Sequence, residues 1–281
     1  MTDDIRHPVV AGAFYAGKRE ALRQHLSTLL DRSCPAPASP LRAPVTLIAP
    51  HAGYPYSGPT AGKGYAAVAS MGKPHRVILL GANHTGLGPP VCVDNHALWR
   101  TPLGDVPVDR VTVNRLASSG IPVDRAPFIQ EHSLEVQLPF MQALWPSELT
   151  IVPLLIQFAP LTLLSEAAKI LRTITGPDDA TLIVVSSDFT HYEADAAARR
   201  TDHLALDHIL ALNAAGFHDL CRTAGFSICG AGAITISMFI ADSLRLDRSR
   251  VVDYATSGDV TGDRSAVVGY ASVLFSRGEH D

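Results

Sequence analysis

Three segments of the sequence place a histidine just after a run of apolar residues. His51 follows LIAP, His84 follows VILLGAN, and His191 ends LIVVSSDFTH, a segment that also carries Asp188. Such runs are typical of buried strands, and ligands of open α/β sheets gather at the carboxyl ends of the strands. If the three strands are parallel neighbours, the four side chains converge on one cleft.

The residue types at these strand ends are suited to metal binding or to acid–base chemistry. Neutral imidazole is the commonest protein ligand for transition metals, and a carboxylate or thiolate often completes the set. His51 and His84 are 33 residues apart, about one strand–helix–strand crossover, so adjacent strands would present both rings to one ion. Asp188 and His191 could form an acid–base pair or supply ligands. A turn histidine can also be purely structural, but three strand ends with one pattern favour a shared site.

Two further segments carry chemically capable side chains. QEHSLEVQLPF places Glu131 and His132 at a predicted helix start, where negative charge is favoured, although helix capping alone would explain them. FSICGAGAI places Cys229 before a Gly-Ala-Gly turn that opens a helix, a position that favours the thiolate. On the residues alone, a buried and unreactive cysteine is the favoured interpretation of Cys229.

Apolar runs rich in β-branched residues alternate with helix-length segments along the chain. Strands are predicted over 45–50, 76–82, 149–156, 181–187 and 266–275. Helices are predicted over 18–32, 58–71, 133–145, 161–175, 193–213 and 232–246. This alternation predicts an α/β fold with a central, mostly parallel or mixed sheet and helices on both faces. Residues 33–44, rich in Pro and Ala, are interpreted as a loop within a single domain of residues 1–281.

Composition excludes several classes of function. The 281 residues contain 23 Lys and Arg against 27 Asp and Glu, with no basic run longer than Arg199-Arg200, so nucleic-acid binding is not expected. No apolar run has the length of a membrane span, and the N-terminus does not resemble a signal peptide. The four cysteines form no CxxC pair, which favours a reduced, cytoplasmic setting. The twelve histidines exceed what composition alone leads one to expect.

Taken together, the motifs resemble those of the Memo family, whose bacterial and archaeal members are called AmmeMemoRadiSam system protein B. The matching segments occur in the family's order and cover nearly the whole chain. They are RHPVVAGAFYAG, APHAGYPYSG, LLGANHTG, TPLGDVPVD, EHSLEVQLPF, SSDFTHY, CGAGAI and YATSGDVTGDRSAVVGYAS.

The resemblance implies a fold similar to the class III extradiol dioxygenases of the LigB type, which are non-haem iron enzymes. Carried over by motif, the metal ligands fall on His51, His84 and Cys229, with cysteine where the dioxygenases have glutamate. The acid–base pair falls on Asp188 and His191, and a further pocket histidine falls on His132. A thiolate shifts the metal preference from Mg and Ca towards Fe(II), which we expect, or Cu or Zn.

Three functions follow as hypotheses. The first is a metal-dependent, non-haem iron oxygenase-like redox protein, in which His191 supported by Asp188 is the acid or base and His132 orients the ligand. The second is a non-catalytic binding or adaptor protein that holds a small molecule or peptide in the same pocket. The family name points to AMMECR1-like and radical SAM proteins as its pathway partners. The third is a zinc hydrolase built on the same histidines.

Overall fold

The computed structural model describes residues 4–30, 39–146 and 149–278. Its main sheet has the strand order β10-β11-β2-β8-β3-β7-β4. Four central strands run parallel to one another. They are β2 (Val45–Ala49), β8 (Thr181–Ser186), β3 (Arg76–Ala82) and β7 (Ile151–Ile156). All their residues except Arg76 are buried, as expected for continuous apolar strands covered on both faces.

Antiparallel strands complete the sheet on both sides. β11 (Val267–Ser276) pairs with β2, and β10 (Arg248–Thr256) pairs with β11. β4 (Val91–Val93) pairs with β7 at the other edge, while β9 (His191–Glu193) pairs with the start of β11. A separate small sheet contains β1 (Ile5–Arg6), β5 (Leu98–Thr101) and β6 (Gly104–Pro107). The main sheet is therefore mixed and open rather than a barrel, which confirms the predicted class.

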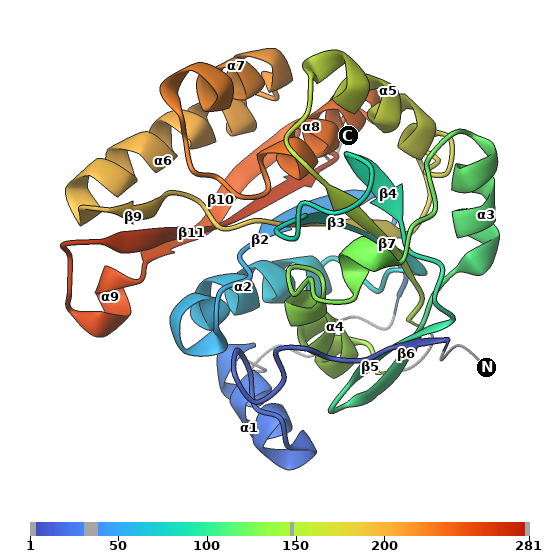
Figure 1. Cartoon of the computed structure of the whole chain (residues 1–281), viewed down its shortest axis with the longest axis horizontal. Coiled ribbons are helices and arrows are strands. Elements are labelled where there is room, and N and C mark those ends of the chain that lie inside the picture. The colour runs from blue at the N-terminus through green and yellow to red at the C-terminus, as the bar shows by residue number, and fades with distance from the viewer. Residues whose placement is uncertain (1–3, 31–38, 147–148, 279–281) are drawn as a thin grey trace.

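Helices cover both faces of the main sheet (Figure 1). One face is covered by α1 (Arg19–Leu29), α2 (Tyr54–Ala69) and α4 (Leu138–Leu144). The other is covered by α5 (Leu161–Arg172), α6 (Asp195–Leu210), α7 (Ala214–Ala224) and α8 (Ala231–Ser243). α3 (Arg110–Ser118) lies beside β4 and β7, and the short α9 (Gly258–Thr261) connects β10 to β11. Single 3-10 turns occur at Ala126–Phe128 and Glu135–Gln137.

Some predicted boundaries differ from those in the structure. The helix predicted over 193–213 ends at Leu210, and α7 follows it without having been predicted. The helix predicted over 133–145 begins with a 3-10 turn, so its α-helical part starts only at Leu138. Within the predicted loop 33–44, residues 33–38 lie outside the described residues. In the described ranges, no helix has both the length and the apolarity needed to cross a membrane.

The register of the central strands brings their carboxyl ends level. Ser186 at the end of β8 lies opposite Ala49 of β2 on one side and Gly81 of β3 on the other. The spacing predicted that the strands before His51 and His84 are adjacent. This is wrong, because β8 lies between them. Gly81 lets another segment approach closely, because a Cβ there would lie 2.6 Å from Ser133 Oγ. The loops that follow β2, β3 and β8 consequently open at one edge of the sheet, with residues 131–134 packed against them.

Candidate metal centre

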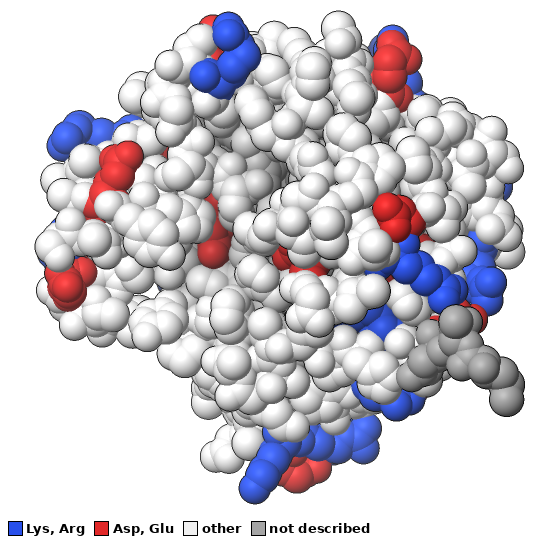
Figure 2. All heavy atoms as spheres, viewed as in Figure 1, with Lys and Arg blue, Asp and Glu red and all other residues white. Residues whose placement is uncertain are grey.

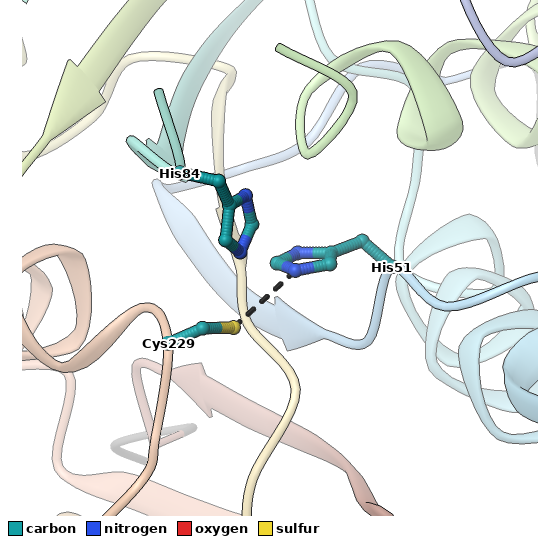
Figure 3. Close-up of side chains that lie close together, drawn as sticks. All are labelled: His51, His84 and Cys229. Atoms are coloured by element: carbon teal, nitrogen blue, oxygen red, sulfur yellow. Dashed lines mark hydrogen bonds between the residues drawn. The ribbon is translucent and has the colours of Figure 1, made fainter. Parts of the chain in front are cut away.

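Three predicted metal ligands come together at this edge. One ligand atom from each of His51, His84 and Cys229 lies within 4.8 Å of the other two. Cys229 Sγ is 3.3 Å from His51 Nε2, and the two imidazole rings are 5.2 Å apart between centroids. Figure 3 shows a nitrogen of each ring turned towards the sulfur. The three donors come from the ends of β2 and β3 and from the residue before the Gly230 N-cap of α8.

The protonation of His51 follows from its hydrogen bonds. Ser186 Oγ lies 2.6 Å from the Ser133 carbonyl oxygen, 2.8 Å from Gln137 Nε2 and 2.9 Å from His51 Nδ1. The carbonyl can only accept, so the single hydroxyl proton of Ser186 is donated to it, and the hydroxyl oxygen accepts from the other two. His51 therefore carries its proton on Nδ1. Its Nε2 lone pair faces Cys229.

Burial keeps the His51 ring neutral. The side chain is buried, which lowers its pKa well below the usual value, and the nearby His132, His84 and His191 lower it further. A neutral imidazole with a free Nε2 is the form that binds metals. The apolar sheet and the Ser186 hydrogen bond together prepare His51 as a ligand.

His84 is oriented by the buried carboxylate of Glu131. The carboxylate accepts from the His84 backbone N–H and, at 2.9 Å, from His84 Nδ1, so Nε2 is the nitrogen that a metal would bind in place of a proton. Burial raises the pKa of Glu131, but its hydrogen bond with His84 and the His84 charge outweigh this and lower the pKa to about 2. Burial likewise lowers the pKa of His84, but the hydrogen bond and the charge of Glu131 have the larger effect, so the pKa is raised. A carboxylate behind a histidine is a common outer partner of metal ligands.

Glu131 also belongs to a second cluster, in which ligand atoms of His84, Glu131 and His132 lie within 4.8 Å of one another. Its Oε1 already accepts from His84 Nδ1 and from the backbone N–H groups of His132 and Ser133, each within 2.9 Å. An oxygen with three donors has no lone pair left for a cation, and the other oxygen, Oε2, accepts from the His84 backbone N–H. We therefore assign Glu131 to the orientation of His84 rather than to a second metal position.

The surroundings of Cys229 have opposing effects on the pKa of its thiol. The Asp188 backbone N–H donates to its sulfur at 3.2 Å, which favours the thiolate. Burial has the larger effect and raises the pKa of the thiol, with a further increase from the charge of Asp188. Without a metal, the site thus holds a thiol beside a neutral imidazole. A bound transition metal would displace the thiol proton, because a coordinating sulfur is deprotonated.

Asp188 and His191 lie at the same sheet edge but have separate hydrogen-bond partners. Asp188 Oδ1 accepts from the backbone N–H groups of His51, at 2.8 Å, and Ala52, at 3.3 Å. Burial raises the pKa of this carboxyl to about 6, an effect reduced by those bonds. His191 Nδ1 donates to the Ser227 carbonyl oxygen at 2.8 Å, so its Nε2 is an acceptor. The hydrogen bond that orients His191 therefore goes to Ser227, while Asp188 fixes the turn that carries His51.

His132 is positioned by ring contacts. It stacks on His84 with centroids 4.8 Å apart, and Phe14 meets it edge-on at 4.9 Å. Burial lowers its pKa, and the charge of Glu131 only partly offsets this. His132 is thus a neutral ring beside the ligand cluster, available to contact a small molecule there.

The site also depends on residues that the sequence patterns did not assign to it. Ser186, Gln137 and Ser227 set the orientation of His51 and His191, and Glu131 does so for His84. Gln137 had no pattern to mark it, because its amide reaches Ser186 only through the tertiary fold. Helix capping alone would explain Glu131 in the sequence, and the adjacent His132 is the one signal there that connects it with the site.

The residues present fit a transition metal. Two imidazole nitrogens and one sulfur converge, and an acceptor holds a proton on the far nitrogen of each ring. The fold and this site define an α/β protein with a candidate two-histidine, one-cysteine metal centre at the carboxyl edge of an open mixed sheet.

Comparisons with known proteins identify the family. The family model described as Memo-like protein matches residues 6–274. A MEMO1 family protein of Thermotoga neapolitana is 37% identical over 281 residues, covering 97% of this chain and 100% of the relative. A MEMO1 family protein of Desulfurococcus amylolyticus is 38% identical over 280 residues, covering 96% and 98%. The chain belongs to the Memo family, as its motifs predicted.

Proposed function

We propose that the chain is a metal-binding redox protein of the non-haem iron oxygenase-like type. The supporting observation is the convergence of His51 Nε2, a ring nitrogen of His84 and Cys229 Sγ, with both imidazole protons held away from the cluster. Such orientation is what a resident metal requires of its ligands. The proposed likeness in fold to class III extradiol dioxygenases is consistent with an open mixed sheet that carries its site at the strand ends.

The donor set favours Fe(II) over the hard cations. Thiolate and imidazole select transition metals, whereas Mg and Ca prefer oxygen ligands, so Cu and Zn remain the competing ions. Three protein ligands leave coordination positions open, as in the two-histidine, one-carboxylate iron sites. A bound iron would supply one-electron chemistry and a Lewis acid to a ligand in those positions.

The remaining residues supply proton handling and shape. His191 presents Nε2 as a proton acceptor because Ser227 holds its Nδ1 proton. We assign it the role of general base or acid, with His132 as the ring that orients the ligand. Asp188 keeps the His51 turn in place through two backbone hydrogen bonds. The free nitrogens thus lie on side chains that are already fixed before a ligand arrives.

Metal analysis of variants tests this proposal. Wild-type protein purified without added metal should contain iron or copper, while His51→Ala and Cys229→Ala should lose it. The matched control is Cys221→Ala, at a buried cysteine with no place in the site. Titration with Co(II) should give a thiolate charge-transfer band in wild type and Cys221→Ala but not in Cys229→Ala. Retention of wild-type metal content by both His51→Ala and Cys229→Ala would refute the site.

A second function is favoured by one observation, the 3.3 Å contact between Cys229 Sγ and His51 Nε2. The contact lets the thiol donate to the imidazole, so the site is internally satisfied without a metal. This suits an adaptor that takes up and passes on a metal, a small molecule or a peptide, with AMMECR1-like and radical SAM proteins as pathway partners. Consumption of O2 with an aromatic substrate would favour the enzyme. Stoichiometric binding without turnover over many hours would favour the adaptor.

A further inference from the structure

One residue beside the site has a backbone conformation that its own side chain disfavours. Among the described residues, Tyr192, Leu212 and Arg245 are the non-glycine residues with positive φ, at 61°, 51° and 55°. Leu212 and Arg245 each directly follow a helix C-cap, where a left-handed residue is common. Tyr192 follows no helix. Its conformation therefore needs a different explanation.

A β-bulge produces the unusual conformation of Tyr192. Val268 of β11 lies opposite His191 and Val267 lies opposite Glu193, so Tyr192 is the extra residue of β9. Hydrogen bonds on both sides hold the bulge, from Phe189 N–H to the Gly269 carbonyl and from Asp195 N–H to the Arg264 carbonyl. Bulges commonly redirect a side chain next to an active site. The surrounding strands thus impose a conformation that costs stability.

The Tyr192 side chain makes few contacts that would stabilise the fold. It is 78% exposed, and its hydroxyl makes no hydrogen bond to any residue that the structure describes. Its ring meets the His191 ring edge-on, with centroids 5.8 Å apart. Glycine would serve the left-handed position better. The bulge instead holds a large aromatic ring beside the His191 ring.

We propose that Tyr192 is a ligand-contacting, specificity-determining residue that packs against a planar, unsaturated part of the molecule bound at the metal centre. This inference rests on the proposed function. Tyrosine supplies a wide apolar face at a small cost in conformational entropy, and aromatic faces pair well with other planar groups. A ligand that holds the metal with one end would therefore extend past His191 to the Tyr192 ring.

Two probes of different length test the proposal on Co(II)-loaded protein. Imidazole fills an open metal position but is too short to extend to Tyr192, whereas 4-phenylimidazole carries a planar ring beyond the metal. Wild type and Tyr192→Phe should bind 4-phenylimidazole about three- to tenfold more tightly than imidazole, the range of one aromatic pair. Tyr192→Gly should lose this preference, keep its affinity for imidazole, and unfold at a higher urea concentration than wild type.

The matched control is Arg245→Gly, which relieves a similar conformation at an exposed position at the far end of α8. It should also gain stability, with no change towards either probe. An unchanged preference for 4-phenylimidazole in Tyr192→Gly, or no preference in wild type, would overturn the role of Tyr192 and leave the metal centre standing. If Tyr192→Gly is no more stable than wild type, the Tyr192 backbone is not strained, and the inference loses the observation on which it begins. A wild-type protein that bound no metal would refute the proposed function and this inference with it.

Discussion

Glu131 holds His84 by two hydrogen bonds, one to its backbone N–H and one to its Nδ1. Together they fix both the position of the loop after β3 and the rotation of the imidazole ring. Because the carboxylate is only 1% exposed, water does not compete for these bonds. The His84 ring therefore faces the cluster in one orientation. The contribution of Glu131 can be measured through metal affinity and through the free energy of unfolding.

The first prediction concerns metal affinity. Glu131→Gln keeps the shape of the side chain but removes the charge that anchors His84, so affinity for Co(II) or Zn(II) should fall about 10- to 100-fold. Competition with a chromophoric chelator measures this. Glu166→Gln, the same change at an exposed residue of α5, should bind as wild type does. Equal affinities for Glu131→Gln and wild type would show that Glu131 does not support the ligand.

The second prediction concerns acid stability of the metal-free protein. The pKa of Glu131 is about 2 in the folded protein, below its value of about 4.3 in an unfolded chain. A lowered carboxyl pKa stabilises the fold above the unfolded value, and this stability is lost as pH falls towards the folded value. Between pH 5 and 2, wild type should lose roughly 3 kcal/mol that Glu131→Gln does not. Urea unfolding at several pH values gives the difference, and parallel profiles would contradict it.

Much of the fold could be predicted because its centre is made of continuous apolar strands. β2, β3, β7 and β8 are buried on both faces, so the sequence carries uninterrupted runs that polar loops bound clearly. The edge strand β10 was not predicted, because its residues are mostly exposed or half-buried and mix charged with apolar side chains. β4 is only three residues long, too short for any periodicity to show.

The site could be predicted in part for a similar reason. Strand ends marked His51, His84 and Asp188, because parallel strands bring their carboxyl ends to one edge. Cys229 has no such signal in its own segment, and only the family motif assigned it. The insertion of β8 between β2 and β3, and the pairing of His191 with Ser227, depend on contacts between segments distant in the chain. Local patterns hold no information on those contacts.

The third prediction concerns the loop that carries Asp188 and His191. Buried Asp202 accepts from the backbone N–H and hydroxyl of Thr190, and from the Tyr254 hydroxyl at 2.7 Å. Tyr254→Phe leaves a buried carboxylate oxygen without its donor and should cost about 1–3 kcal/mol in the free energy of unfolding. Tyr192→Phe removes a hydroxyl that bonds to no described residue and should stay within about 0.5 kcal/mol of wild type. Similar losses in the two variants would contradict the role given to Asp202.

The fourth prediction concerns protons released when a metal binds. Burial raises the pKa of Cys229, so the thiol is protonated in the metal-free protein at pH 8, and coordination must displace that proton. Adding Zn(II) to wild type in a weakly buffered dye solution at this pH should release the thiol proton in addition to protons from metal-bound water, and affinity should rise as pH rises. Cys221→Ala should release the same amount, since its thiol lies outside the cluster. Cys229→Ala should release about one proton fewer per metal added, and proton release equal to wild type in that variant would show that another group supplies the proton.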